Sequence, residues 1–324
     1  MTEVNTEHLD MKQLEGLDLM PPLYDYRSVH LVDGVDLDIY FPGSHASEAD
    51  LGEPGEFKTI LKNTDIFLPE MAGWIGDDVG NYNKISKGDF KRYERTLKEL
   101  QLGYGGSHPY FQKALFASLY NTHVSVAFVD LPRGHRLLAP LDELVGYVPP
   151  SIGSFQDEID LSRSWLVAFA KLDMKREEHI LSSFSQTVED KIQSNPKLRS
   201  RRDNADISVA MLLGSSHAGI YDAFEHTREQ TTAVDPNLRF SVTPHYGFAK
   251  RKITFSEQVH ARVIRGLPVD DLLIAKCVLA DRLVQDDPAM IPGSSTDKFE
   301  QMYFSKIDPL SLQELSELYD RLQP

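Results

Sequence analysis

The sequence predicts an α/β protein: a mixed, largely parallel sheet flanked by helices, with a helical extension at the C-terminal end. Two observations lead to this class. Up to about residue 244, short apolar runs alternate with amphipathic segments of helical length, and this alternation is typical of sheets with parallel pairs. From about residue 254 the apolar spacing is that of helices alone.

The length of the chain allows one large domain with an appendage. Its 324 residues are 41% hydrophobic, which is enough to bury a sizeable core. We predict a polar lead-in over residues 1–20, an α/β catalytic-like domain over residues 21–250 and a helical extension over residues 251–324 that packs on it.

The first predicted elements are strands. In "SVHLVDGVDLDIYF" apolar residues alternate on both sides of Asp33-Gly34, and this dipeptide favours a hairpin turn because both turn positions need positive φ. We expect the second strand of that hairpin over residues 35–41. The run "TDIFLPE" predicts the next strand over residues 65–68.

Helices and a third strand are expected in the middle of the chain. "SKGDFKRYERTLKEL" has apolar residues at helical spacing with Ser86 as its expected cap, and "HPYFQKALFASLY" has Pro109 suited to a first turn. We predict a loop in the stretch "EMAGWIGDDVGNYNK", which follows the strand predicted over residues 65–68. The third strand, "VSVAFVDLPRG", ends its apolar run at Asp130.

The second half repeats the alternation. Residues 155–195 predict one or two long helices that stop at Pro196. "ISVAMLLGSSH" is too short and too closely flanked by turn residues for a helix, so we interpret it as a buried strand. A helix in "AGIYDAFEHTREQ" and a strand over residues 238–244 follow, then the C-terminal helices, with "DDPAMIPGSSTDKFE" as an exposed loop.

Composition excludes several classes of protein. The net charge is −15 and the longest basic run is "KLRSRR", so the chain lacks the basic face that a nucleic-acid partner requires. A single cysteine, Cys277, rules out a disulfide framework within one chain. No run of about eighteen apolar residues could span a membrane, and the first residues lack a signal-peptide pattern. We therefore predict a cytoplasmic protein.

Polar residues at the ends of the predicted strands form the candidate site. Function in parallel sheets collects in the crevice beyond the carboxyl ends of the strands. The residues expected there are His45, Glu48, Glu70, Asp130 and His217. Two histidines and several carboxylates suit a divalent metal or acid/base chemistry.

Each of these residues also has a simpler interpretation. His45 could be a loop histidine, Glu70 could pair with a Lys or Arg, and Asp130 could form a turn. His217 is the strongest candidate, because Gly214 and the two serines before it would let the backbone approach a ligand. We expect His217 at the rim of the site, with few core contacts.

The remaining histidines are weaker candidates. His108 follows a glycine pair and could line the same rim, and His245 follows another predicted strand. We expect the others to be surface or packing residues: His8, His30, His123, His135, His179, His226 and His260.

Four segments together resemble a known superfamily. "GSHAS", "LPE", "FVDLP" and the late block "LLGSSHAGIYDAF" resemble the TraB/PrgY and TIKI group, with ChaN-like and erythromycin-esterase proteins as more distant relatives. The likeness covers about residues 29–244. It departs from the family at Pro42, which stands where a glycine is usual, and in the upstream arginine, for which Arg201 and Arg202 are the available residues.

The resemblance implies a hydrolase of the metal-dependent peptidase class. It implies that His45, Glu70 and His217 hold a divalent ion, with Mn, Co and Zn not distinguished, and that Glu70 is either a ligand or the general base. Glu48 and Asp130 would complete the catalytic set. The substrate would be a peptide or small molecule.

Two other functions remain open on the same residues. One is a metal-free, esterase-like hydrolase in which a histidine activates water, and the other is a non-enzymatic protein that binds peptide or haem. Members of the group are often membrane-anchored, but no spanning segment is present here. The C-terminal helices are expected to pack on the domain or to form a homodimer contact.

Overall fold

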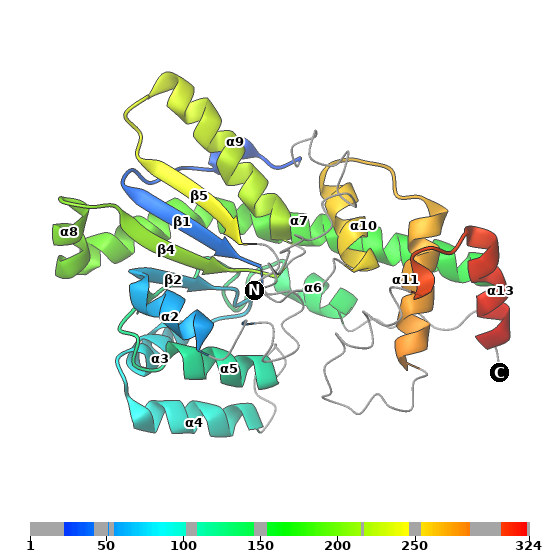
Figure 1. Ribbon diagram of the computed structural model, residues 1–324, viewed down its shortest axis with the longest axis horizontal. Coiled ribbons are helices and arrows are strands. Elements are labelled where there is room, and N and C mark those ends of the chain that lie inside the picture. Colours follow the sequence, from blue (N-terminus) through cyan, green and yellow to red (C-terminus); the bar gives the residue numbers. More distant parts are fainter. Residues whose placement is uncertain are drawn as a thin grey trace, which may run out of the picture. The chain divides into compact units, whose positions relative to one another are not determined.

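The computed structural model describes residues 23–41, 51, 55–101, 109–145, 154–214, 217–245, 254–285 and 306–322. The chain forms two compact units. An α/β unit is built from Tyr24–Leu138 and Lys175–Lys250, and a helical unit takes in Ala139–Met174 and Arg251–Pro324. The sequence predicted one continuous α/β segment over residues 21–250, whereas this unit is interrupted, because the long helix α7 (Phe155–Ser194) contributes to both units (Figure 1).

The α/β unit contains a five-stranded sheet, which confirms the predicted fold class. Its strands have the order β3-β2-β4-β1-β5, and every neighbouring pair is parallel. The strands are β1 (Val35–Tyr40), β2 (Ile66–Pro69), β3 (Ser125–Val126), β4 (Ile207–Leu212) and β5 (Phe240–His245). The strands predicted over residues 35–41, 65–68 and 238–244 are confirmed within two residues at each end. The strand predicted in "ISVAMLLGSSH" begins at Ile207 but ends at Leu212, before the glycine, and the third strand is much shorter than its apolar run.

The hairpin predicted around Asp33-Gly34 is wrong. The turn forms, with Gly34 at φ 73°, but residues 29–32 are not a strand. Both sides of β1 are occupied by parallel strands, β4 and β5, so no place is left for a hairpin partner. Instead the turn joins the starts of β1 and β5: Gly34 N donates to Arg239 O (2.7 Å), and Arg239 N donates to Asp33 Oδ1 (2.9 Å).

One face of the sheet is covered by α2 (Glu56–Asn63), α3 (Gly76–Ser86) and α5 (Pro109–Leu119), which Figure 1 shows together beside β2. Buried side chains from both layers form one cluster: Tyr40, Phe57, Phe67, Tyr82, Phe111, Leu115, Phe116, Ala210 and Leu212. α4 (Phe90–Gln101) adds Tyr93 and Leu97 to its edge. Burial raises the pKa of the Tyr82 hydroxyl, so this ring stays neutral in the core.

Two expectations for this layer are corrected. The stretch expected as a loop contains the helix α3, and Ser86 ends that helix instead of capping the next one. Ser86 is buried, and its hydroxyl donates to Val124 O (2.6 Å). The cap of α4 is Asp89, whose Oδ1 accepts from Arg92 N (3.0 Å).

The other face of the sheet is covered by α7 and α9 (Ala218–Val234). Phe184 of α7 lies 4.8 Å from Phe224 of α9, and Phe224 lies 6.1 Å from Phe240 of β5, measured between ring centres. The long predicted helix is a single one of 40 residues. Pro196 occupies the first turn of α8 (Pro196–Arg202), with Asn195 Oδ1 accepting from Lys197 N (3.0 Å).

Two shorter helical segments are the 3-10 turn η1 (Tyr26–Ser28), which belongs to the α/β unit, and α6 (Leu138–Val145), which belongs to the helical unit except for Leu138.

The helical unit confirms the predicted C-terminal helices. They are α10 (Phe255–Ile264), α11 (Asp271–Gln285) and α13 (Leu312–Leu322). Thr254 and Glu257 form a reciprocal capping box at the start of α10. The core of this unit includes Phe255, Leu279 and Tyr319, and Cys277 is a buried member of it. No helix among the described residues is long and apolar enough to cross a membrane.

The Gly34 turn gives a test of the fold. Gly34→Ala places a Cβ at positive φ and 2.8 Å from Nη2 of Arg239, so we expect the free energy of unfolding to fall by about 1–2 kcal/mol. Gly80→Ala is the matched control, because Gly80 lies inside α3 with open space around it. That change should stabilise the protein by roughly 0.5–1 kcal/mol. Equal denaturation midpoints for both variants would contradict this role of the turn.

Candidate functional site

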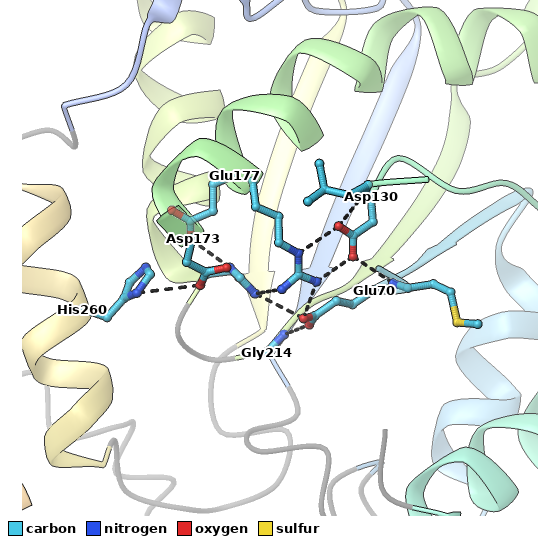
Figure 2. A network of polar contacts seen from close by, with 10 residues as sticks. Glu70, Asp130, Asp173, Glu177, Gly214 and His260 are labelled. Atoms are coloured by element: carbon cyan, nitrogen blue, oxygen red, sulfur yellow. Dashed lines mark hydrogen bonds and ion pairs between the residues drawn. The ribbon is translucent and has the colours of Figure 1, made fainter. Parts of the chain in front are cut away.

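The carboxyl ends of β2, β3 and β4 bring three predicted positions together. Glu70 directly follows β2, Asp130 follows the short β3, and Gly214 follows β4. Because the strands are parallel, these residues lie at one edge of the sheet, and Figure 2 shows their side chains or backbone converging.

Arg176 of α7 binds two of these carboxylates. Its Nε and Nη2 donate to Oδ1 and Oδ2 of Asp130 (2.9 and 2.6 Å), and Nη2 also donates to Oε1 of Glu70 (2.8 Å). Asp130 is 1% exposed, Arg176 13% and Glu70 15%. This is a bidentate, largely buried ion pair, the geometry in which an arginine is held most firmly.

Backbone groups hold the two carboxylates from the other side. Asp130 accepts from the N–H groups of Met71 (3.0 Å) and Leu131 (2.7 Å). Gly214 N donates to Oε2 of Glu70 (2.6 Å). The close backbone approach expected at Gly214 therefore exists, and it serves the carboxylate of Glu70.

His217 lies between two carboxylates. Its Nδ1 is 2.9 Å from Oε1 of Glu177, and its Nε2 is 3.2 Å from Oε1 of Glu70. The hydroxyl of Tyr24 donates to Oε2 of Glu177 (2.6 Å). His217 is 2% exposed and Glu177 0%, so the expectation of an open rim histidine is wrong: His217 is buried, but among polar partners.

The partners of His217 allow its ring to gain or lose a proton without turning. An ionised Glu177 can only accept, and with it the hydrogen of this pair is on Nδ1 of His217. Nε2 faces Glu70, which can only accept, and Nη1 of Arg176 at 3.5 Å, which can only donate. A charged ring can donate to Glu70, and a neutral ring can accept the longer bond from Arg176. The arrangement therefore suits proton transfer at Nε2 of His217.

Sequence reasoning found part of this site. Glu70, Asp130 and His217 are brought together as predicted. Glu70 also pairs with an arginine, Arg176, which was the simpler interpretation of this residue. His45, Glu48 and His108 lie outside the described residues. His245 bonds through Nε2 to Asp38 (2.8 Å), away from this network.

Arg176 and Glu177 were missed. The arginines considered instead are paired elsewhere, Arg201 with Asp65 and Arg202 with Glu189. A signal for Glu177 was present: it lies at helical spacing with Ile180 and Phe184, which are buried. A carboxylate on the apolar stripe of a helix requires a partner, because a buried charge is otherwise costly.

Residues of metal-binding type also gather at a neighbouring turn of α7. Oδ2 of Asp173 lies 3.7 Å from Nδ1 of His260 on α10. Asp173 and His260, both in the helical unit, are buried and of ligand type. A buried histidine and carboxylate group that could hold a metal is therefore present, but it is not the expected set of His45, Glu70 and His217.

No family model, curated protein or solved structure matches this chain. The resemblance to the TraB/PrgY and TIKI superfamily therefore stays a prediction.

The ion pair of Arg176 gives a second test. Arg176→Met leaves the carboxylate of Asp130 buried without its cation, and we expect a loss of about 3–5 kcal/mol of unfolding free energy. Adding Asp130→Asn removes the stranded charge and should recover at least about 1 kcal/mol. Arg201→Met is the control, since its pair with Asp65 is half exposed on the arginine side and should contribute about 1 kcal/mol or less. Strict additivity in the double variant, measured by urea denaturation, would refute a buried pair.

Proposed function

We propose that this chain is a hydrolase in which His217 is the general base and Arg176 provides the positive charge of the site. The observation that supports this best is the placement of the His217 ring: Glu177 orients Nδ1 at 2.9 Å, and Nε2 faces Glu70 and Arg176. A carboxylate that fixes the tautomer of a histidine is the arrangement that general-base catalysis uses.

The reaction would proceed through proton transfer at Nε2. Neutral His217 takes a proton from a water molecule beside Glu70, and the hydroxide attacks the carbonyl carbon of an ester or amide. The imidazolium then gives that proton to the leaving oxygen or nitrogen. Between these steps the charged ring lies between Glu177 and Glu70, which stabilise it. Glu70 and Arg176 retain more exposure than His217, so substrate would approach on their side.

Charge supports the metal-free form of this chemistry. The cation held by Glu70 and Asp130 is the guanidinium of Arg176. An ion bound to both Glu70 and His217 would lie within a few ångströms of that guanidinium. Repulsion between unit charges at 4 Å is about 4 kcal/mol at an effective dielectric constant near 20, and a divalent ion doubles it. Glu70 and His217 therefore fit a metal poorly.

A metal-dependent peptidase is the second candidate. It is favoured by the Glu177–His217 pair, because a carboxylate behind a histidine is also how proteins orient metal-binding imidazoles. The buried Asp173 and His260 offer ligands of the same type. The ion would be Zn, Mn or Co, and the substrate a peptide or another small molecule.

The test is hydrolysis by the full chain before and after chelator treatment. Nitrophenyl esters and aminoacyl nitroanilides serve as probes. We expect turnover that survives chelation and falls about 10²- to 10⁴-fold in His217→Asn, as loss of a general base implies. Loss of turnover on chelation, with recovery on adding Mn, Co or Zn, would favour the metal-dependent peptidase.

Two controls separate catalysis from stability. His245→Ala removes another strand-end histidine with a carboxylate partner and should leave turnover unchanged. Glu177→Gln should lower turnover and alter its pH profile, because the tautomer of His217 is no longer fixed. Absence of turnover on every probe, in a folded protein, would overturn the hydrolase proposal and favour a protein that binds peptide or haem without cleaving it.

A further inference from the structure

A basic loop directly follows Asp130 of the proposed catalytic network. Residues 131–137 contain Arg133, His135 and Arg136 and no acidic residue, in a chain whose net charge is −15. Both arginine side chains are exposed. Among the described residues neither guanidinium has an ion pair or a hydrogen bond. The loop therefore carries positive charge that the fold itself does not use.

The backbone of this loop is held in place. Arg133 N donates to Trp74 O (2.8 Å), and His135 N donates to Pro132 O (3.0 Å) and so closes a turn. Inside that turn Gly134 has φ 82°, a conformation that favours glycine. The two arginines and His135 are thus presented by an anchored turn.

His179 of α7 lies against the loop. Its ring centre is 5.0 Å from that of His135. Leu137 N donates to Nδ1 of His135 (3.3 Å), so the hydrogen of the neutral His135 ring is on Nε2, which is a donor. The ring of His179 shares a 3.3 Å contact between Nε2 and Oγ of Ser183. His135 therefore offers an N–H group, which suits an anion.

His179 also links the loop to the catalytic network. It lies three residues after Arg176 on α7, and side chains at this spacing are neighbours on the surface of a helix. Burial, and then His135, lower the pKa of His179, while the charge of Asp130 acts in the opposite direction. The lowered pKa favours the neutral ring, so the positive charge of the region comes from the two arginines of the loop. All these residues belong to the α/β unit.

The network leaves the charge of the loop available. The carboxylate of Asp130 is bound by Arg176 and by the backbone N–H groups of Met71 and Leu131, so it does not pair with the arginines of the loop. A guanidinium binds a carboxylate or a phosphate through two parallel N–H bonds. The loop therefore fits an anionic group of a bound molecule.

We propose that Arg133, His135 and Arg136 form an anion subsite, beside His179, that binds a carboxylate or phosphate group of the substrate. That the bound molecule is a substrate rests on the proposed hydrolase function, whereas binding of the anion does not. The substrate class is an ester or amide whose anionic group lies a few bonds from the carbonyl, because His179 and Arg176 are neighbours on α7.

The first measurement compares hydrolysis of two matched probes, the nitroanilides of glutamate and of glutamine, which differ in one charge. We expect kcat/KM of the full chain to be at least about tenfold higher for the glutamate probe, as a charge-assisted pair implies. Arg133→Gln combined with Arg136→Gln should remove this preference. Arg199→Gln is the control and should keep it, because Arg199 is an exposed arginine of α8, which precedes the amino end of β4.

The second measurement needs no turnover. Histidine-labelled protein is titrated with glutarate, and separately with inorganic phosphate, while the ¹⁵N resonances of His135 and His179 are followed. His135→Gln and His179→Gln assign these resonances. We expect a saturable shift with at least one of the two anions, which identifies the preferred group, and loss of that shift in the double arginine variant.

The outcomes separate the subsite from the hydrolase proposal. Saturable binding without turnover of either probe would support the subsite and overturn the hydrolase. Turnover without preference, and with no saturable shift in either titration, would overturn the subsite and leave the hydrolase standing. A glutarate shift without preference between the probes would overturn the assignment to the substrate. Equal binding in the wild type and the double arginine variant, or an equal loss in Arg199→Gln, would also overturn the subsite.

Discussion

The buried pairing of Arg176 with Asp130 and Glu70 is the interaction on which the site depends. It joins α7 to the ends of two neighbouring parallel strands through charge-assisted bonds of 2.6–2.9 Å. Buried charges are stable only when their oppositely charged partners are present, because a buried charge without a partner keeps the full free-energy cost of leaving water. The pairing therefore fixes the position of Glu70, and with it one neighbour of Nε2 of His217.

A single turn of α7 supplies both the cation and the acid that orients the histidine. Arg176 and Glu177 are adjacent in sequence, and Glu177 is held by Tyr24 on one oxygen and His217 on the other. The ring of His217 is thus defined at both nitrogens by groups that are themselves fixed. Such preorganisation is what proton transfer requires, since no group has to move when the charge on the ring changes.

The sequence predicted the sheet better than the site. Short apolar runs between turn residues located β2 and β4. The Asp33-Gly34 turn is a local signal and could not show that β1 already has two parallel neighbours. Helix α3 was missed because Gly76, Gly80 and Asn83 hide its helical spacing. Glu70 and His217 follow from strand ends, whereas Arg176 is one of many charges on a 40-residue helix, and only tertiary packing selects it.

The most direct test of the central claim is the ¹⁵N NMR spectrum of His217 in histidine-labelled protein, assigned by comparison with His217→Asn. We expect Nδ1 to stay protonated through the whole titration, while Nε2 alone gains and loses its hydrogen. This is the state in which Glu177 fixes the ring and Nε2 can accept a proton from water. A neutral ring with its hydrogen on Nε2 and none on Nδ1 would contradict the role of His217 as a general base oriented by Glu177.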